Sequence, residues 1–127
     1  MSVENSAERR VDARALLALT ESIFQRCGMD DRNASLLADT LVASDLRGVH
    51  SHGVIRVPEY VKKLTVQGVN PRGRPRVVRD EGACLVVDAG NNMGQIGAHF
   101  AMERAIERAQ QIGLAATAVR GSNHCGK

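Results

Sequence analysis

Residues 83–97 have the sequence Ala-Cys-Leu-Val-Val-Asp-Ala-Gly-Asn-Asn-Met-Gly-Gln-Ile-Gly. The first part is a short apolar run rich in valine, which predicts a strand, and the glycines after it predict a turn. Apolar residues then recur at helical spacing from Ile96 to Ile112, so a helix ending at Gly113 is expected. A strand, a turn and a helix in this order predict a mixed α/β fold.

Further strands are predicted on both sides of this stretch. Residues 76–80 and 83–88 flank Glu81-Gly82, which is typical of a tight hairpin turn. Residues 114–119 form another apolar run after the helix. We therefore expect a mixed sheet, with the helix from Gly97 to Gly113 covering one of its faces.

The chain before the hairpin is predicted to be helical. An apolar stripe within residues 12–26 ends at Gly28, and a second helix, capped by Asp30 or Asp31, fades near Gly48. Helical periodicity stops at the proline-containing linker 70–75. Residues 1–70 are thus predicted to form a helical amino-terminal region, and residues 71–127 the beginning of an α/β domain.

A third helical stretch, from Ser51 to about Gly68, contains Pro58. Proline removes a backbone donor and clashes with the preceding turn. The helix therefore either kinks at this proline or begins anew with Pro58 in its first turn.

The richest set of chemical groups lies in residues 44–60, Ser-Asp-Leu-Arg-Gly-Val-His-Ser-His-Gly-Val-Ile-Arg-Val-Pro-Glu-Tyr. If the chain is helical from Ser51 onward, His52, Arg56 and Tyr60 lie on one face, with Ser51 at its edge. Such a face could hold an oxyacid: Arg56 offers a fork of donors, His52 a proton near neutral pH, and the two hydroxyls neutral hydrogen bonds. An ordinary polar helix face explains the same spacing.

Composition narrows the class of protein. The 127 residues permit one domain at most, and 43% apolar with 24% charged residues is typical of a folded chain. No run is long enough to cross a membrane, and the three cysteines lack paired spacing, which favours a reducing cytoplasm. The net charge is +3, but one tyrosine and two phenylalanines are too few for base stacking, so nucleic-acid binding is not expected.

Two other kinds of site are suggested by local patterns. Gly90, Gly94 and Gly97 lie between a strand and a helix, but their spacing departs from Gly-x-Gly-x-x-Gly, and a turn that lets a helix pack on a strand explains them equally. A zinc site could draw on four side chains scattered along the chain. They are His50, His52, His124 and Cys125.

Together these residues resemble the malate/L-lactate dehydrogenase family of NAD(P)-dependent oxidoreductases, which is distinct from the Rossmann-type lactate and malate dehydrogenases. The resemblance extends from about residue 12 to the last residue, in the family's order. The residues that carry it are 45–53 with Arg56, Pro58 and Tyr60, then 87–94, then 105–109 with Gly113, and finally 122–126.

The resemblance implies a non-Rossmann fold and exchange of a hydride between NAD or NADP and a small 2-hydroxy or 2-oxo acid. It makes His52 the proton donor and acceptor, and His124 a second catalytic residue facing the same pocket. Arg56 would bind the carboxylate, and Ser51 and Tyr60 would help to place it. No cofactor-binding residue and no metal ligand is assigned, and the complete enzyme would be a homodimer.

Members of the family are considerably longer, and their nicotinamide site is built mostly from later sequence. Residues 1–127 therefore resemble an amino-terminal piece that carries the substrate side of the site. The alternatives to an active oxidoreductase are an inactive truncated fragment and a zinc-binding module.

Overall fold

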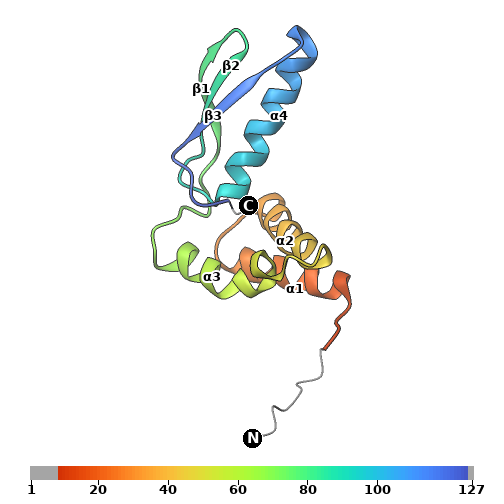
Figure 1. The fold of residues 1–127 in the computed structure, drawn as a ribbon. Helices are drawn as coiled ribbons and strands as arrows, with labels where there is room; N and C mark the ends of the chain where they lie inside the picture. Colours follow the sequence, from red (N-terminus) through yellow and green to blue (C-terminus); the bar gives the residue numbers. More distant parts are fainter. Residues whose placement is uncertain (1–8, 126–127) are drawn as a thin grey trace, which may run out of the picture.

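The computed structural model describes residues 9–125, so the first residues and Gly126 of the last motif lie outside it. Its elements confirm the mixed α/β class: a helical layer is followed by a hairpin, a long helix and a final strand (Figure 1). In chain order they are α1 (Ala13–Arg26), α2 (Asp31–Leu46), η1 (His50–His52), η2 (Val54–Arg56), α3 (Val57–Thr65), β1 (Arg76–Glu81), β2 (Cys84–Asp88), α4 (Gly94–Ile112) and β3 (Ala116–Arg120).

Each of the first two helices begins directly after an aspartate that caps its first turn. The Asp12 side chain accepts a hydrogen bond from the Ala15 amide at 2.9 Å, and Asp30 accepts one from the Asn33 amide at the same distance. Each carboxylate satisfies a backbone donor that has no partner within the helix. Of the two predicted caps of α2, Asp30 is therefore the one that the structure uses.

The third helical stretch is broken. Residues 50–56 form two short 3-10 turns, η1 and η2, and α3 begins only at Val57, with Pro58 in its first turn. A proline in the first turn removes no intrahelical hydrogen bond, which explains why the helix begins there. Of the two alternatives for this stretch, the structure has the new helix with Pro58 in its first turn. The continuous helix from Ser51 that would place His52, Arg56 and Tyr60 on one face is not formed.

The sheet has the strand order β1-β2-β3. Strands β1 and β2 are antiparallel with Glu81 opposite Cys84, so the hairpin turn is Gly82-Ala83, one residue later than predicted. Strand β3 lies parallel to β2 after the crossover through α4, which packs against both strands as expected (Figure 1). Helix α4 begins at Gly94 rather than Gly97.

The glycines between β2 and α4 allow close backbone packing. A Cβ atom on Gly97 would lie 2.7 Å from the Cβ of Ala89, and one on Gly94 would overlap the carbonyl oxygen of Asn123. Side chains at these positions would push α4 away from β2 and from the segment after β3. Of the two interpretations of the glycine run, the structure supports the packing turn.

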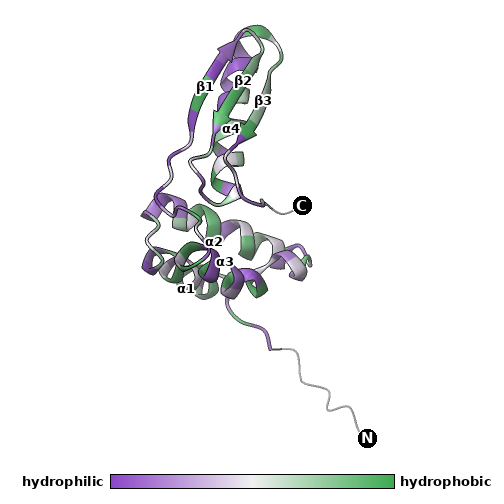
Figure 2. Ribbon diagram, turned by 90° about the vertical axis from the view of Figure 1, so that its left-hand side faces the viewer, coloured by the Kyte–Doolittle hydropathy of each residue, from purple (hydrophilic) through white to green (hydrophobic). Residues whose placement is uncertain are grey.

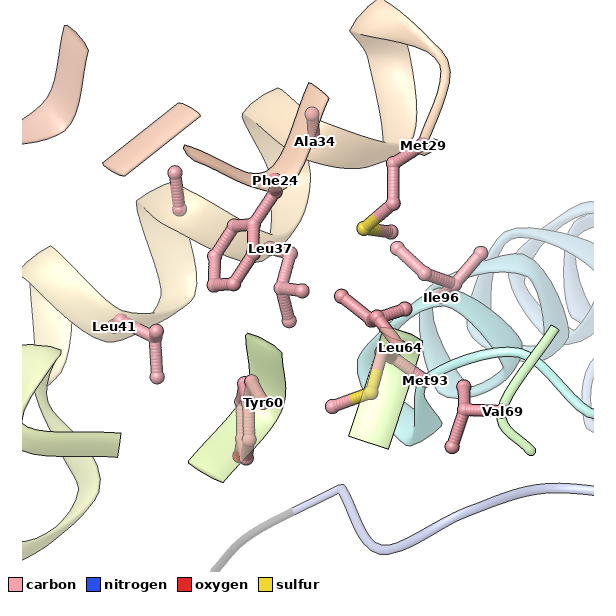
Figure 3. Packing of buried hydrophobic residues seen from close by; sticks show 11 residues of the cluster. Phe24, Met29, Ala34, Leu37, Leu41, Tyr60, Leu64, Val69, Met93 and Ile96 are labelled. Atoms are coloured by element: carbon pink, nitrogen blue, oxygen red, sulfur yellow. The ribbon is translucent and has the colours of Figure 1, made fainter. Parts of the chain in front are cut away.

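The main core joins the helical layer to the start of α4. Phe24 from α1 and Leu37 from α2 are fully buried, and Met93 and Ile96 extend into the same cluster from the glycine turn and α4 (Figure 3). In Figure 2 the apolar colour is strongest on β2, the central strand, whereas β1 is mostly polar and exposed. No helix among residues 9–125 is long and apolar enough to cross a membrane.

Candidate functional site

The loop that carries His52 is held by one carboxylate. Asp45, near the end of α2, accepts hydrogen bonds from the Val54 amide and from Nδ1 of His50, each at 2.8 Å. Gly53 packs directly against this carboxylate, since a Cβ there would overlap Oδ1 of Asp45. Asp45 thus fixes the two 3-10 turns.

His52 lines a cavity of about 290 Å³ between the end of α2, the first 3-10 turn, α3 and the start of α4. Tyr60 from α3 lines it too, so the structure brings together two of the predicted site residues. The remaining wall consists of Asp39, Thr40, Ala43, Ser44, Arg47, Gln95 and Cys125. The cavity therefore presents an imidazole, a phenol and a guanidinium to a small ligand.

Tyr60 is only 4% exposed, and its ring packs beside Phe24 with a centroid separation of 6.5 Å. The Lys63 ammonium lies 5.7 Å from the centre of the ring, and Nε2 of Gln95 donates a hydrogen bond to the phenol oxygen at 3.0 Å. These contacts hold the ring in one place, and Tyr60 and Gln95 both line the cavity.

Ser51 and Arg56 lie on a neighbouring hollow, lined also by Ile55 and Glu59. Arg56 donates from Nε to the Ser51 carbonyl oxygen at 2.7 Å and from a terminal nitrogen to Glu59 at 2.9 Å. Ser51 also lies beside His52, with 2.9 Å between Oγ and the imidazole Nδ1. The two hollows are thus linked through Ser51, but Arg56 does not line the cavity that contains His52.

Glu59 is the anion that holds Arg56. The pKa of its carboxyl group is lowered, first by the hydrogen bond with Lys63 and then by the one with Arg56. The carboxylate therefore stays charged at neutral pH. An acid ligand at Arg56 would therefore compete with Glu59.

His124 is exposed and does not line the His52 cavity, whereas its neighbour Cys125 does. The segment from Asn123 to Cys125 approaches the first turn of α4 because Gly94 has no side chain. Asn123 anchors this segment by donating to the carbonyl oxygens of Asn91 and Asn92. The second histidine motif therefore reaches the edge of the cavity.

The described residues offer no metal centre. Within residues 9–125, no three side chains of histidine, cysteine, aspartate or glutamate lie close enough together to hold an ion. His50 contacts Asp45, and His99 on α4 contacts Glu103 at 3.4 Å. The zinc-binding alternative thus lacks a ligand set in this part of the chain.

Arg47 and Gln95 are cavity residues that the sequence-based prediction missed. Arg47 follows α2, and no carboxylate among the described residues lies within ion-pair distance of it. Its position in the sequence, next to the histidine-containing loop, was a usable signal. Gln95 lies in the first turn of α4 and gave no signal, because only the tertiary fold brings it to Tyr60.

The described part of the chain is thus a mixed α/β fold with an imidazole, a phenol and a guanidinium around a small cavity. The sequence matches the malate/L-lactate dehydrogenase family over residues 11–127, and the chain belongs to this family. It is 35% identical to hydroxycarboxylate dehydrogenase B of Escherichia coli O157:H7 over 93% of its length and 32% identical to the NAD(+) ureidoglycolate dehydrogenase of that organism over 92%.

Solved structures agree with this assignment. Malate dehydrogenase from Pyrococcus horikoshii OT3 superimposes with a TM-score of 0.91 at 32% identity, covering 99% of this chain and 36% of that one. The chain also covers 33% of hydroxycarboxylate dehydrogenase B and 34% of ureidoglycolate dehydrogenase. It therefore spans about a third of the length of the relatives that it matches.

Proposed function

We propose that this chain carries the acid-binding part of an oxidoreductase that exchanges a hydride between NAD or NADP and a small 2-hydroxy or 2-oxo acid. The observation that carries the proposal is the cavity shared by His52 and Tyr60, with Arg47 on its wall. The names of the relatives, which include hydroxycarboxylate and malate dehydrogenases, support the substrate class.

His52 is the proposed proton donor and acceptor. Oxidation of a carbinol requires its hydroxyl proton to pass to a base, and an imidazole is a side chain that can take up and return a proton. The contact between Nδ1 and Ser51 leaves Nε2 of His52 as the nitrogen for the ligand. Tyr60 then contributes a neutral hydrogen bond to a ligand oxygen. His124 does not line the cavity and stays in the proposal as a second catalytic residue by family resemblance alone.

The ligand carboxylate requires a cation. Arg56 is the residue that the family resemblance favours, and it reaches a ligand once it leaves Glu59. Arg47 already lines the cavity and has no carboxylate partner among the described residues. A bidentate guanidinium contact orients an acid more strictly than an ammonium does. Replacement of each arginine by lysine therefore identifies the anchor: only the lysine variant of the anchoring residue raises the KM for the acid.

The nicotinamide, when bound, supplies or accepts the hydride. The glycine turn before α4 does not fit its pyrophosphate, because backbone and side-chain atoms of Asn123, Cys125 and Ala89 fill the space next to Gly94 and Gly97. The described residues are thus proposed to serve binding and proton transfer on the acid side.

The proposal also includes a homodimer and a cytoplasmic location. Size-exclusion chromatography with light scattering tests whether the protein is a dimer.

The direct test is an assay of the 127-residue chain with NADH and NADPH and a panel of 2-oxo acids, together with melting curves. Oxidation of either nucleotide, lost in His52→Ala without a change in melting temperature, is the expected result. Full turnover in His52→Ala would remove this residue from proton transfer. The inactive-fragment alternative describes this chain if it oxidises neither nucleotide and if neither nucleotide raises its melting temperature.

A further inference from the structure

Gln95 donates a hydrogen bond to Tyr60 inside the His52 cavity. Its Nε2 lies 3.0 Å from the phenol oxygen, and both residues line the cavity wall. The contact joins the first turn of α4 to α3, two elements far apart in the sequence. The Tyr60 hydroxyl group therefore has a fixed partner on the side of α4.

The other end of the same amide has no partner. Oε1 of Gln95 is buried and meets no hydrogen-bond donor among the described residues. A buried acceptor without a donor lowers the stability of a fold, and an apolar side chain of similar length would avoid this cost. The stability of the fold therefore does not explain why an amide side chain occupies position 95.

The hydrogen bond restricts the direction of the Tyr60 proton. A phenol oxygen can accept a hydrogen bond and donate its own proton. Because the Gln95 amide approaches as a donor, the phenol proton must point elsewhere, and the cavity is the side that remains open beside it. In this arrangement Tyr60 is a hydrogen-bond donor toward a ligand, and it suits an oxygen with free lone pairs such as that of a carboxylate or a carbonyl.

We propose that Gln95 is a positioning residue that turns the Tyr60 hydroxyl group into a fixed donor for an oxygen of the acid substrate. The proposal rests on the proposed function for its ligand, but the contact between Gln95 and Tyr60 is testable without a ligand. Gln95 acts through Tyr60 and touches no reacting atom. Replacing Gln95 should therefore weaken ligand binding by no more than removal of the Tyr60 hydroxyl group does.

The chain is well suited to a spectroscopic test, since it contains one tyrosine and no tryptophan. Near-ultraviolet absorbance therefore reports the hydrogen bonding of Tyr60 alone. Gln95→Leu removes the donor and the buried acceptor together, and Gln110→Leu on an exposed position of α4 is the matched control. We expect the tyrosine band to shift in Gln95→Leu and not in the control, while the melting temperature of Gln95→Leu stays equal or rises.

Ligand binding supplies the second readout, with pyruvate as the probe in isothermal titration calorimetry. Loss of one neutral hydrogen bond weakens binding by up to about tenfold. We expect this loss in Gln95→Leu and in Tyr60→Phe, and no further loss in the double variant, because the two residues act as one unit. Additive losses in the double variant would overturn the positioning role.

The two proposals fail in different ways. If the unaltered chain binds no 2-oxo acid, the proposed function is contradicted, and the tyrosine band alone decides the role of Gln95. An unshifted band in Gln95→Leu would overturn the inference even if the chain proves active. A markedly lower melting temperature in that variant would also overturn it, since Gln95 would then be a structural residue.

Discussion

Gly53 lies against the carboxylate of Asp45, and this contact fixes the loop that carries His52. The backbone of Gly53, with φ of −90°, is open to any residue, so the need for glycine is one of space. A methyl group at this position would overlap the carboxylate, which must then release the Val54 amide. We expect Gly53→Ala to lower the free energy of unfolding by about 1–3 kcal/mol, measured by urea denaturation.

A double-mutant cycle provides the control for this prediction. In an Asp45→Ala background the obstructing carboxylate is gone, so Gly53→Ala should cost much less than it does in the unaltered chain. Equal costs in the two backgrounds would mean that the overlap with Asp45 is not the cause.

Glu59 is expected to limit the access of Arg56 to an acid ligand. Its pKa is lowered by Lys63 and Arg56, so the carboxylate holds the guanidinium at every pH above that lowered value. Glu59→Gln removes the competing charge while keeping the size of the side chain. If Arg56 anchors the acid, the Kd for pyruvate should fall about two- to fivefold, the range expected for an exposed ion pair.

The matched control is Glu107→Gln, because Glu107 forms an ion pair with Arg104 at the same helical spacing but away from the cavity. The Kd should not change in this variant. An unchanged Kd in Glu59→Gln as well would leave Arg47 as the cation at the site.

Residue types alone indicated part of this site. His52 and Tyr60 were predicted together, and both line one cavity. A shared helix face is not what joins them, because two 3-10 turns replace the first part of the predicted helix. Gln95 reaches the cavity only through the packing of α2 against the start of α4, and no local sequence pattern contains that information.

Asp88 ties β2 to the end of β3. Its Oδ1 accepts from the Gly90 amide at 2.9 Å, and its Oδ2 accepts from Arg120 at 3.3 Å. The hydrogen bond from Gly90 is the largest cause of the lowered pKa of this carboxyl group, ahead of the charge of Arg120. A lowered pKa in the folded state stabilises the fold above the unfolded value of about 3.9, and the gain is lost as the pH falls through the lowered value.

Asp88→Asn should therefore melt at a lower temperature than the unaltered chain at about pH 7, and the difference should shrink as the pH falls through the lowered pKa of Asp88. Thermal unfolding followed by circular dichroism at a series of pH values measures this. Asp39→Asn, at an exposed position of α2, is the control. A difference that persists at the acidic end of the series would assign the effect to shape rather than charge.

The elements differ in how well local rules predicted them. Helices α1 and α2 begin at capping aspartates, which are visible in any sequence. The apolar face of α4 was recognised, yet Ile106 and Ile112 are 51% and 53% exposed. Helical periodicity identifies the apolar face of a helix, but it does not identify the element that packs against that face. Among the described residues, none covers these two isoleucines fully.

One core joins the helical layer to the start of α4. Met93 precedes α4 yet lies, fully buried, among residues of the first helices, including Phe24 and Leu37 (Figure 3). The sequence predicted a helical region and an α/β region, with a boundary near residue 70. It did not predict a core that crosses this boundary, because no sequence pattern around Met93 indicates which residues it packs against.

Met93→Ala should test this linkage. Removing a buried methionine side chain costs about 2–5 kcal/mol, through lost burial and the cavity left behind. If one core joins the two parts, tyrosine fluorescence from Tyr60 in α3 and far-ultraviolet circular dichroism from all elements should report the same, lowered urea midpoint. Met102→Ala is the control, since Met102 on the same helix is 60% exposed and its loss should change stability by no more than about 0.5 kcal/mol. Separate midpoints for the two signals would show that the helical layer unfolds independently of α4 and the sheet, and that the cavity between them can open without unfolding either.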